Sequence, residues 1–429
     1  MKKQIAINEL PIRIVFYILC ALYGGLCLYL FYNQSIQQAY GDSLLFESDL
    51  PYHISMVVDD GWYYSLTAFV YAFLYKIAGG TVLIAVFLAL VAAGTVIATQ
   101  KLLELIVSDR YGISCAGALA LNFVMPFFVK WAGMYRYVSY QSPNVWHNST
   151  YIVMRLCAVI FMYFYVKYEK DYAEKSISFK RWLILALLLA LTTFVKPSFL
   201  TVFAPALALK LLWDLVKKRV KFLRVFLMGI TVVPSMLVIL WQNSVLFGED
   251  TDSGYKISFM ETFSFHADHP KVTVLLSLAF PIVVFVCLAV ETLIRLASNK
   301  RACKAGNKED NEKDNQNGDK EDNKKEKMLT SPYSDKTYIF SLIMAVIGFA
   351  EAILLIETGH RSKDGNFLWG YSAALFFLYL TSFKMWYGFI KEKKWIPAAA
   401  CGAVFAYQIV CGAIFFTRLI SGETYFMIG

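Results

Sequence analysis

The stretch WYYSLTAFVYAFLYKIAGG, residues 62–80, decides how this chain crosses a membrane. It is apolar enough to suggest a membrane-spanning helix. However, only about 16 residues separate Trp62 from the Gly79-Gly80 pair that breaks the helix, whereas a span needs about 20. Every later segment changes sides according to whether residues 62–80 cross the bilayer or lie flat on its surface.

The composition of the whole chain is typical of a polytopic membrane protein. Of its 429 residues, 58% are hydrophobic and 17% are charged, and the mean hydropathy is +0.51. Soluble domains are about half apolar and a quarter charged. We expect an all-α fold with eleven transmembrane helices, at residues 12–32, 81–100, 112–132, 151–167, 182–195, 198–214, 225–245, 272–295, 338–356, 367–384 and 396–417.

The distribution of basic residues resolves the ambiguity of residues 62–80. If this stretch lies flat on the outer surface, 31 of the 41 Lys and Arg residues fall in cytoplasmic segments; if it spans, only 13 do. We therefore expect an interfacial helix in the first outer loop, with the N-terminus inside and the C-terminus outside. The location expected is a bacterial cytoplasmic membrane. The short basic bursts between apolar runs follow loop topology and do not indicate nucleic-acid binding.

A highly charged segment divides the chain. Residues 299–336 include NKEDNEKDNQNGDKEDNKKEK, which has almost nothing apolar and cannot form a core. We expect a disordered cytoplasmic linker there, with a regulatory or docking role as the alternative. It would separate an N-terminal membrane module, residues 1–298, whose outer loops carry the active site, from a C-terminal three-helix membrane module, residues 337–429.

Titratable residues gather in the first outer loop, in ESDLPYHISMVVDDGW. On an amphipathic helix in this loop, Asp49 and His53 are four residues apart and share a face, and Asp60 follows near the same side. A carboxylate beside an imidazole at the rim of a membrane suits a general base. The alternative is that Asp49 caps the helix and His53 rests among lipid headgroups.

The second outer loop, GMYRYVSYQSPNVWHNSTY, contains Arg136, Asn144, His147 and Asn148 among five aromatic residues. These side chains could bind an anion and hydroxyl groups while the rings stack on a sugar. The alternative is an aromatic belt at the membrane surface.

Three further outer segments carry candidate ligands. Lys196 lies at a tight turn between two spans, and the loop ETGHRSKDGNFLWGY places His360 and Arg361 near Trp369. Such cations could hold a lipid phosphate, because Arg offers a fork of donors; a snorkelling lysine is the alternative for Lys196. The motif HADH at residues 266–269 could ligate a metal, although this spacing is common in hydrated loops.

The order of these elements resembles the polytopic glycosyltransferases of the C superfamily (GT-C fold), which use polyprenyl-phosphate sugars. The resemblance rests on SDLPYHI, on YYSLTAFVYAFLYKIAGG and on the long span from Thr81, within residues 10 to 200. It implies inverting sugar transfer on the outer face, from a polyprenyl-phosphate sugar to a glycan, lipid or protein acceptor.

The resemblance also implies roles for individual residues. Asp49 would act as the base, with His53 and Asp60 as further catalytic candidates. Arg361 would hold the lipid phosphate, helped by His360 or Lys196. Sugar or acceptor binding would fall to Arg136, Asn144, His147, Asn148 and Trp369. Many members carry an acidic residue in the second outer loop, which this chain lacks. A divalent cation is therefore possible but not favoured, and no other cofactor is implied.

Two other classes of function compete with the transferase. A transporter or lipid flippase would commonly show internal repeats and charged, broken spans near the bilayer midplane. No repeat is evident here, and polar residues concentrate on one side. A polysaccharide polymerase or ligase would use similar donors, but commonly with a larger late outer loop rich in Arg.

Overall fold

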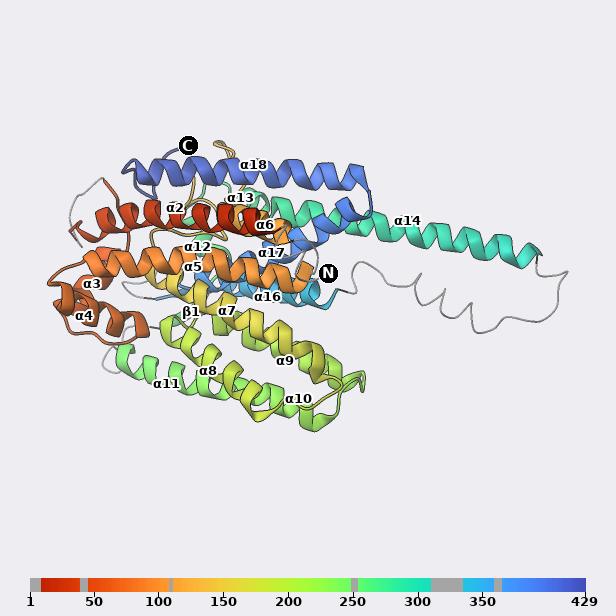
Figure 1. Cartoon of the computed structure of the whole chain (residues 1–429), viewed down its shortest axis with the longest axis horizontal. Helices are drawn as coiled ribbons and strands as arrows, with labels where there is room; N and C mark the ends of the chain where they lie inside the picture. The colour runs from red at the N-terminus through yellow and green to blue at the C-terminus, as the bar shows by residue number, and fades with distance from the viewer. Residues whose placement is uncertain (1–8, 39–44, 108–110, 248–253, 310–334, 359–364) are drawn as a thin grey trace.

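The computed structural model describes residues 9–38, 45–107, 111–247, 254–309, 335–358 and 365–429, and these residues are mostly helical (Figure 1). The elements are α2 Leu10–Ser35, α3 Leu50–Val58, α4 Leu66–Ala78, α5 Val82–Val107, α6 Tyr111–Leu121, α7 Ser149–Tyr172, α8 Phe179–Val195, α9 Ser198–Val216, α10 Phe222–Gly229, η1 Ile230–Val232, α11 Val233–Phe247, β1 Tyr255–Ile257, α12 Glu261–Ser264, α13 Pro270–Ser277, α14 Ala279–Glu309, α16 Lys336–Leu354, β2 Leu355–Glu357, α17 Leu368–Lys391 and α18 Trp395–Ile420. The two short strands, β1 and β2, pair antiparallel.

The described residues contain nine helical segments that are long and apolar enough to cross a membrane. The protein is thus an all-α polytopic membrane protein. These segments match nine of the eleven spans predicted, α10 to α11 forming one of them. The other two predicted spans correspond to α6 and α8, which have only 11 and 17 residues. The count of eleven stays a prediction.

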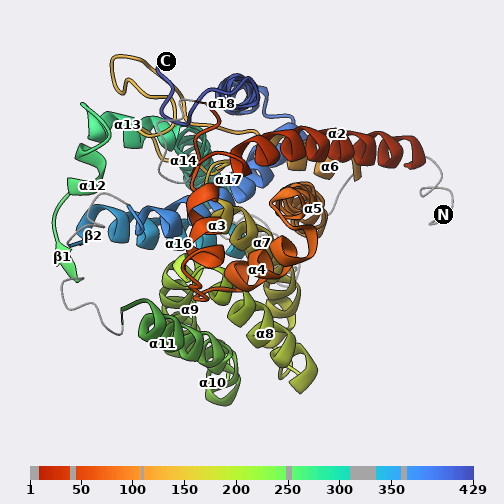
Figure 2. The same ribbon diagram turned by 90° about the vertical axis from the view of Figure 1, so that its left-hand side faces the viewer.

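The helices differ in how deeply they lie in the bundle (Figure 2). In α7 and α17, 72% and 67% of the most apolar stretch is buried, whereas only 22% is buried in α14 and in the α10–α11 segment. The outer helices expose large apolar side chains such as Leu22, Leu90 and Leu237, which suits contact with lipid.

Residues 62–80 form a helix too short to cross a bilayer. Ser65 caps α4 by accepting a hydrogen bond from the backbone N–H of Ala68, and Gly79 ends it with a φ of +65°. At 13 residues, α4 is about 20 Å long, against a hydrocarbon core of about 30 Å. Its exposed face carries Phe69, Phe73 and Ile77, four residues apart. Such a stripe suits a helix lying on the membrane surface, which stays a prediction.

The predicted span 112–132 is helical only as far as Leu121. Met125-Pro126 follows, and a residue before proline disfavours the helical conformation. The chain then runs without regular structure through residues 122–148, much of it buried. It passes very close to α18: a Cβ added to Gly412 would lie 1.4 Å from the carbonyl oxygen of Phe123, so only glycine fits.

Polar side chains inside the bundle satisfy the backbone of this irregular segment. The amide of Asn144 donates to the carbonyls of Leu121 and Val124, at 2.8 and 2.7 Å. Arg155, on α7 and 2% exposed, donates to the side-chain oxygens of Asn144 and Asn122. Non-helical backbone at membrane depth is tolerated only where protein groups complete its hydrogen bonds. Arg155 therefore stabilises the segment that leads to α7.

The three C-terminal helices share one core with the preceding helices. Helices α16 and α17 pack against α9, and α18 packs against α14 and α2. Residues 1–298 and 337–429 are therefore consecutive segments of the chain whose described helices pack into one core. Helix α14 continues to Glu309, into the region expected to be a linker, while residues 310–334 lie outside the described residues.

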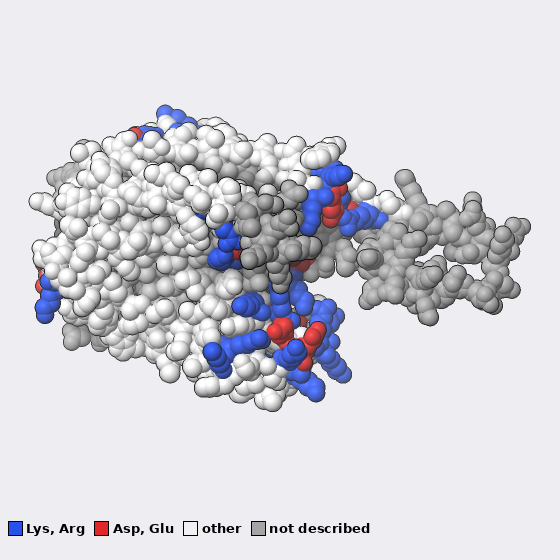
Figure 3. Space-filling view, viewed as in Figure 1, with Lys and Arg blue, Asp and Glu red and all other residues white. Residues whose placement is uncertain are grey.

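The two ends of the bundle differ in charge. Helices α3 and α4 lie at one end, the left end in Figure 1, and α18 also finishes there. On the face shown in Figure 3, most Lys and Arg side chains gather at the opposite end. We call these the α3 end and the basic end. The charge difference agrees with the positive-inside distribution predicted from the sequence.

Candidate functional site

Asp49 lies where the first loop enters α3, at the α3 end of the bundle. As the residue preceding α3, it is held by its own backbone N–H, which donates to the carbonyl of His147 at 3.0 Å. Its carboxylate Oδ2 accepts a hydrogen bond from Asn148 Nδ2 at 2.6 Å. Two contacts with the second loop thus fix the position of the carboxylate.

Asn148 connects this carboxylate to a cation. It is the N-cap of α7, where its Oδ1 accepts from the backbone N–H of Tyr151 at 2.9 Å. The same oxygen accepts from Thr150 Oγ1 at 2.9 Å and from Lys196 Nζ at 3.4 Å. Only one amide group therefore separates the Asp49 carboxylate from the Lys196 ammonium.

Lys196 reaches this point from the tight turn between α8 and α9. Its backbone is extended because Pro197 follows, and its Nζ donates to Thr150 Oγ1 at 3.1 Å. The ammonium also lies 4.8 Å from the ring centroid of Trp369, in the first turn of α17. This cation–π contact and the two hydrogen bonds hold the charge in place.

His147 belongs to a cluster of aromatic rings beside Asp49. Its ring stacks on Tyr425 with centroids 4.2 Å apart and an interplanar angle of 13°, and it meets Tyr137 edge-on at 4.5 Å. Burial, reinforced by the charge of Lys196, lowers the pKa of His147 to about 3. The imidazole is therefore neutral near pH 7 and acts as an uncharged packing surface.

Burial and the acidic residues at the α3 end raise the pKa values of nearby titratable groups. Burial and the negative charge of Asp49 raise the pKa of Glu47. Burial, with the charges of Asp49 and Glu47, also raises the pKa of Tyr425. Burial raises the pKa of Tyr137 well above its usual value, with Tyr151 and Asp49 adding to the effect. Both phenols therefore remain protonated and can donate hydrogen bonds.

The residues of the candidate site differ in their exposure to solvent. His147, Asn148, Thr150 and Tyr151 are buried, whereas Asp49, Lys196, Trp369 and Tyr425 are half-buried. The supporting groups thus lie inside the protein, and the two charged groups and two of the rings retain access to a ligand. A carboxylate, an ammonium and aromatic rings held this way are suited to proton abstraction beside an anionic, ring-shaped substrate.

The structure brings together five of the residues predicted from the sequence: Asp49, His147, Asn148, Lys196 and Trp369. They come from four segments that are distant along the chain: the start of α3, the second loop, the turn before α9 and the first turn of α17.

The remaining predicted residues have other contacts or are not described. His53 Nδ1 pairs with the Tyr64 hydroxyl at 3.2 Å, and Asp60 is exposed beyond the far end of α3. Asn144 has its amide bound to backbone carbonyls, as described above. The guanidinium of Arg136 lies over Phe128, 4.4 Å from the ring centroid. His360 and Arg361 lie outside the described residues.

Three members of the cluster were not singled out from the sequence: Thr150, Tyr137 and Tyr425. Tyr425 belongs to the segment after α18, which is fastened over the second loop. There the backbone N–H of Arg136 donates to the Met427 carbonyl, and that of Gly429 donates to the Met134 carbonyl. Nothing in the local sequence GETYFMIG signals this contact. Thr150 lies in the motif Asn148-Ser149-Thr150, which suggests glycosylation more readily than a binding role.

Within the described part of the chain, no group of three or more His, Cys, Asp or Glu side chains is arranged to hold a metal ion. The chain matches no protein-family model, and no match to it was found among curated proteins.

Proposed function

We propose that this protein is a membrane glycosyltransferase, which moves a sugar from a polyprenyl-phosphate donor to a glycan, lipid or protein acceptor at the α3 end of the bundle. The observation that carries the proposal is the pairing of the half-buried Asp49 carboxylate and Lys196 ammonium through Asn148. The polytopic helical architecture supports it, because a lipid-linked donor has to be reached from within the bilayer.

In the proposed reaction, Asp49 accepts the proton of an acceptor hydroxyl. The acceptor oxygen forms a bond to the anomeric carbon of the sugar as the bond from that carbon to the phosphate oxygen breaks. The phosphate leaves with the bonding electron pair, and the anomeric configuration inverts because there is a single displacement.

Lys196 is placed to stabilise the negative charge that develops on the leaving phosphate, because its position is fixed before reaction by Thr150, Asn148 and Trp369. Arg361 and His360 remain the sequence-based candidates for the same phosphate. Asn148 orients the base, and Trp369 and Tyr425 form the walls against which a sugar ring would lie.

The test is sugar transfer by the purified full chain from a panel of radiolabelled polyprenyl-phosphate sugars, with wild type compared with Asp49→Asn. Loss of a general base lowers turnover by about 10²–10⁴-fold. Asp59→Asn is the matched control: Asp59 is an exposed acid at the other end of α3, bonded to Ser55 at 2.8 Å. Asp60→Asn, tested in parallel, checks the other acid predicted from the sequence.

Equal loss of turnover in all three variants would indicate a general effect of charge and refute the role of Asp49. Facilitated movement of the lipid across vesicles, without release of the sugar, would favour a transporter or flippase instead.

A further inference from the structure

A buried amide lies on one of the outermost helices of the bundle. Gln242, on α11, is only 4% exposed, whereas its neighbours Leu240 and Trp241 are exposed. Burying an amide in an apolar environment is costly unless the amide forms hydrogen bonds. The partners of Gln242 therefore indicate what this side chain does on a helix that otherwise faces lipid.

The Gln242 amide bridges two backbone segments at the α3 end. Its Nε2 donates to the carbonyl of Phe194 at 3.0 Å and to the carbonyl of Tyr64 at 3.2 Å. Its Oε1 has no hydrogen-bond partner among the described residues. Exchanging the two atoms would place Oε1 against two carbonyl oxygens, so the surroundings assign the NH₂ group to this position. Gln242 thus acts as a donor that joins two carbonyls.

The Phe194 carbonyl belongs to the last turn of α8, where carbonyls lack partners within the helix. The helix ends because Lys196, two residues later, has an extended backbone. The Phe194 ring also lies between Phe69 of α4 and Trp241 of α11, with centroid distances of 6.0 and 5.5 Å. The amide and these two rings therefore hold the backbone from which the Lys196 side chain extends.

The Tyr64 carbonyl belongs to the loop between α3 and α4. The hydroxyl of the same residue pairs with His53 Nδ1 on α3, the helix that begins directly after Asp49. Gln242 therefore links the turn that carries Lys196 to a loop that contacts the helix beside Asp49.

We propose that Gln242 is a positioning residue for Lys196, which holds the end of α8 so that the ammonium stays against Asn148 and Thr150. This inference rests on the proposed function, in which Lys196 stabilises the leaving phosphate. A cation lowers the barrier only when it is correctly placed, and a displacement of about 1 Å can lower turnover by about 10²-fold. Loss of the amide therefore acts on turnover through Lys196.

The experiment combines Gln242→Met with Lys196→Met in a double-mutant cycle of sugar transfer by the purified full chain. Methionine is unbranched like glutamine but has no hydrogen-bond donor. We expect Gln242→Met to lower kcat about tenfold when Lys196 is present. It should lower kcat less than about twofold in the Lys196→Met background, because the cation that it positions is then missing. A loss of equal size in both backgrounds would overturn the proposal.

A second readout does not require turnover. It is the rate at which a water-soluble reagent acetylates Lys196, followed by peptide mass spectrometry and compared with the rate at Lys271, an exposed lysine of α13. Gln242→Met should raise the Lys196 rate about fivefold, which corresponds to the loss of about one hydrogen bond that holds the ammonium. An unchanged rate would overturn the proposal, whether or not the protein transfers sugar. A raised rate in a protein that transfers no sugar would support the positioning role and count against the transferase alone.

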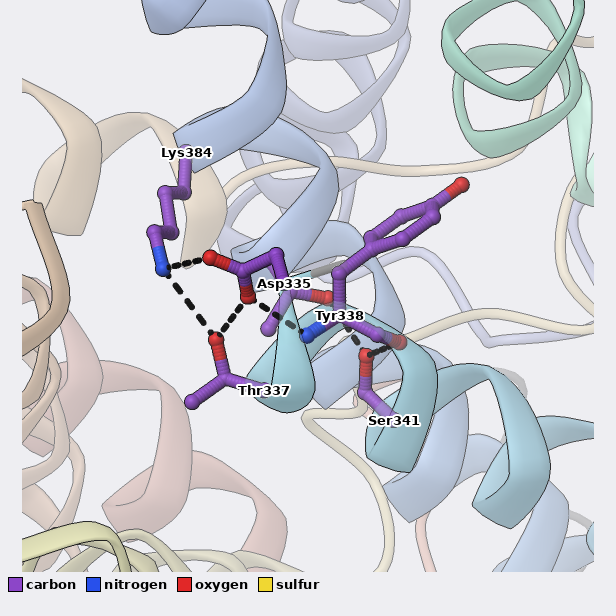
Figure 4. Close-up of polar contacts among 6 residues, drawn as sticks. Asp335, Thr337, Tyr338, Ser341 and Lys384 are labelled. Carbon is purple, nitrogen blue, oxygen red and sulfur yellow. Dashed lines mark hydrogen bonds and ion pairs between the residues drawn. The ribbon is translucent and has the colours of Figure 1, made fainter. Parts of the chain in front are cut away.

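Lys384→Met is the control for a general loss of stability. Lys384, on α17, pairs with Asp335 and donates to Thr337 Oγ1 at 3.3 Å, which fastens the start of α16 at the basic end (Figure 4). It lies about 22 Å along α17 from Trp369, at 1.5 Å per residue. The control should lower the melting temperature and leave both kcat and the acetylation rate of Lys196 unchanged.

Equal effects of Gln242→Met and the control on Lys196 acetylation would reduce the observation to general loosening of the fold and overturn the proposal. Gln242→Asn is the second variant, and it is measured in the same way if Gln242→Met does not fold. Its amide is one methylene group shorter and cannot reach both carbonyls, so it should also raise the Lys196 acetylation rate.

Discussion

Replacing Asn148 by Asp tests the central contact of the candidate site. The substitution preserves shape, the N-cap of α7 and the oxygen that accepts from Thr150 and Lys196. It replaces only the amide N–H group that donates to Asp49 at 2.6 Å. Two carboxylates then face each other. Their repulsion is removed when the new carboxyl group keeps its proton and donates a hydrogen bond to Asp49 in place of the amide.

The energetic penalty can be calculated from that protonation. Keeping a proton on a carboxyl group with an ordinary pKa of about 3.9 costs about 1.4 kcal/mol for each pH unit above that value. The loss of stability is therefore about 4 kcal/mol at pH 7 and about 1.5 kcal/mol at pH 5. Leaving both groups ionised is no easier, since two charges about 4 Å apart repel by about 4 kcal/mol at an effective dielectric constant of 20. These values are upper limits, because Asp49 is half-buried.

The assay is thermal unfolding in detergent between pH 5 and pH 8. Unfolding entropy of about 2.1 cal/mol/K per residue converts 1 kcal/mol into about 1 °C for a chain of this length. The melting temperature of Asn148→Asp should thus lie about 4 °C below wild type at pH 7 and less than 2 °C below it at pH 5. The new carboxyl group has a raised pKa in the folded state, so its effect is smallest at low pH and grows as pH rises.

The double variant Asp49→Asn with Asn148→Asp provides the matched control. It restores one carboxylate facing one amide, so stability should return to within about 1 kcal/mol of wild type. Sugar transfer should remain absent, because the carboxylate is displaced. A melting-temperature difference that does not change with pH, or a double variant as unstable as the single one, would refute the contact as the structure shows it.

Further predictions concern the pH response, the leaving-group cation and the buried loop. His147 has a pKa lowered from about 6.5 to about 3, so wild type should lose about 1.4 kcal/mol of stability per pH unit below pH 6.5. His147→Phe, which preserves the stacked ring, should remove that part of the acid sensitivity in pH-dependent unfolding; unchanged sensitivity would contradict it. Lys196→Met should lower turnover about 10²-fold with most of the loss in kcat, and Lys196→Arg should recover part of it; a change confined to KM would argue against charge stabilisation. Gly412→Ala should destabilise the fold by about 3 kcal/mol or more, because its Cβ would overlap the carbonyl of Phe123; expression and melting at wild-type levels would show that the loop can shift.

Much of the candidate site could be anticipated from residue chemistry, although not its geometry. Asp49, His147, Asn148 and Lys196 stand out because charged and amide groups are few beside so many apolar runs, and Trp369 stands out because it follows the basic residues of its loop. The pairing of Asp49 with His53 followed from helical spacing, yet the Asp49 carboxylate bonds to Asn148, and the His53 ring bonds to the Tyr64 hydroxyl. Spacing on one helix defines which groups share a face, but not which neighbour from another loop is closer.

The sequence by itself determined the elements that depend on neighbouring residues. These are nine of the eleven predicted spans, the short helix ended by Gly79, and the division into a basic end and an α3 end. The tertiary structure alone decided that Asp49 meets Asn148 across 99 residues and that Tyr425 closes over His147. It also decided that the helix in the predicted span 112–132 ends at Leu121. Apolar side chains are required both for contact with lipid and for burial inside the bundle, so composition cannot distinguish a spanning helix from a buried irregular segment. The irregular segment is accommodated by Gly412 and Arg155, and these two residues reach it only once the helices have packed.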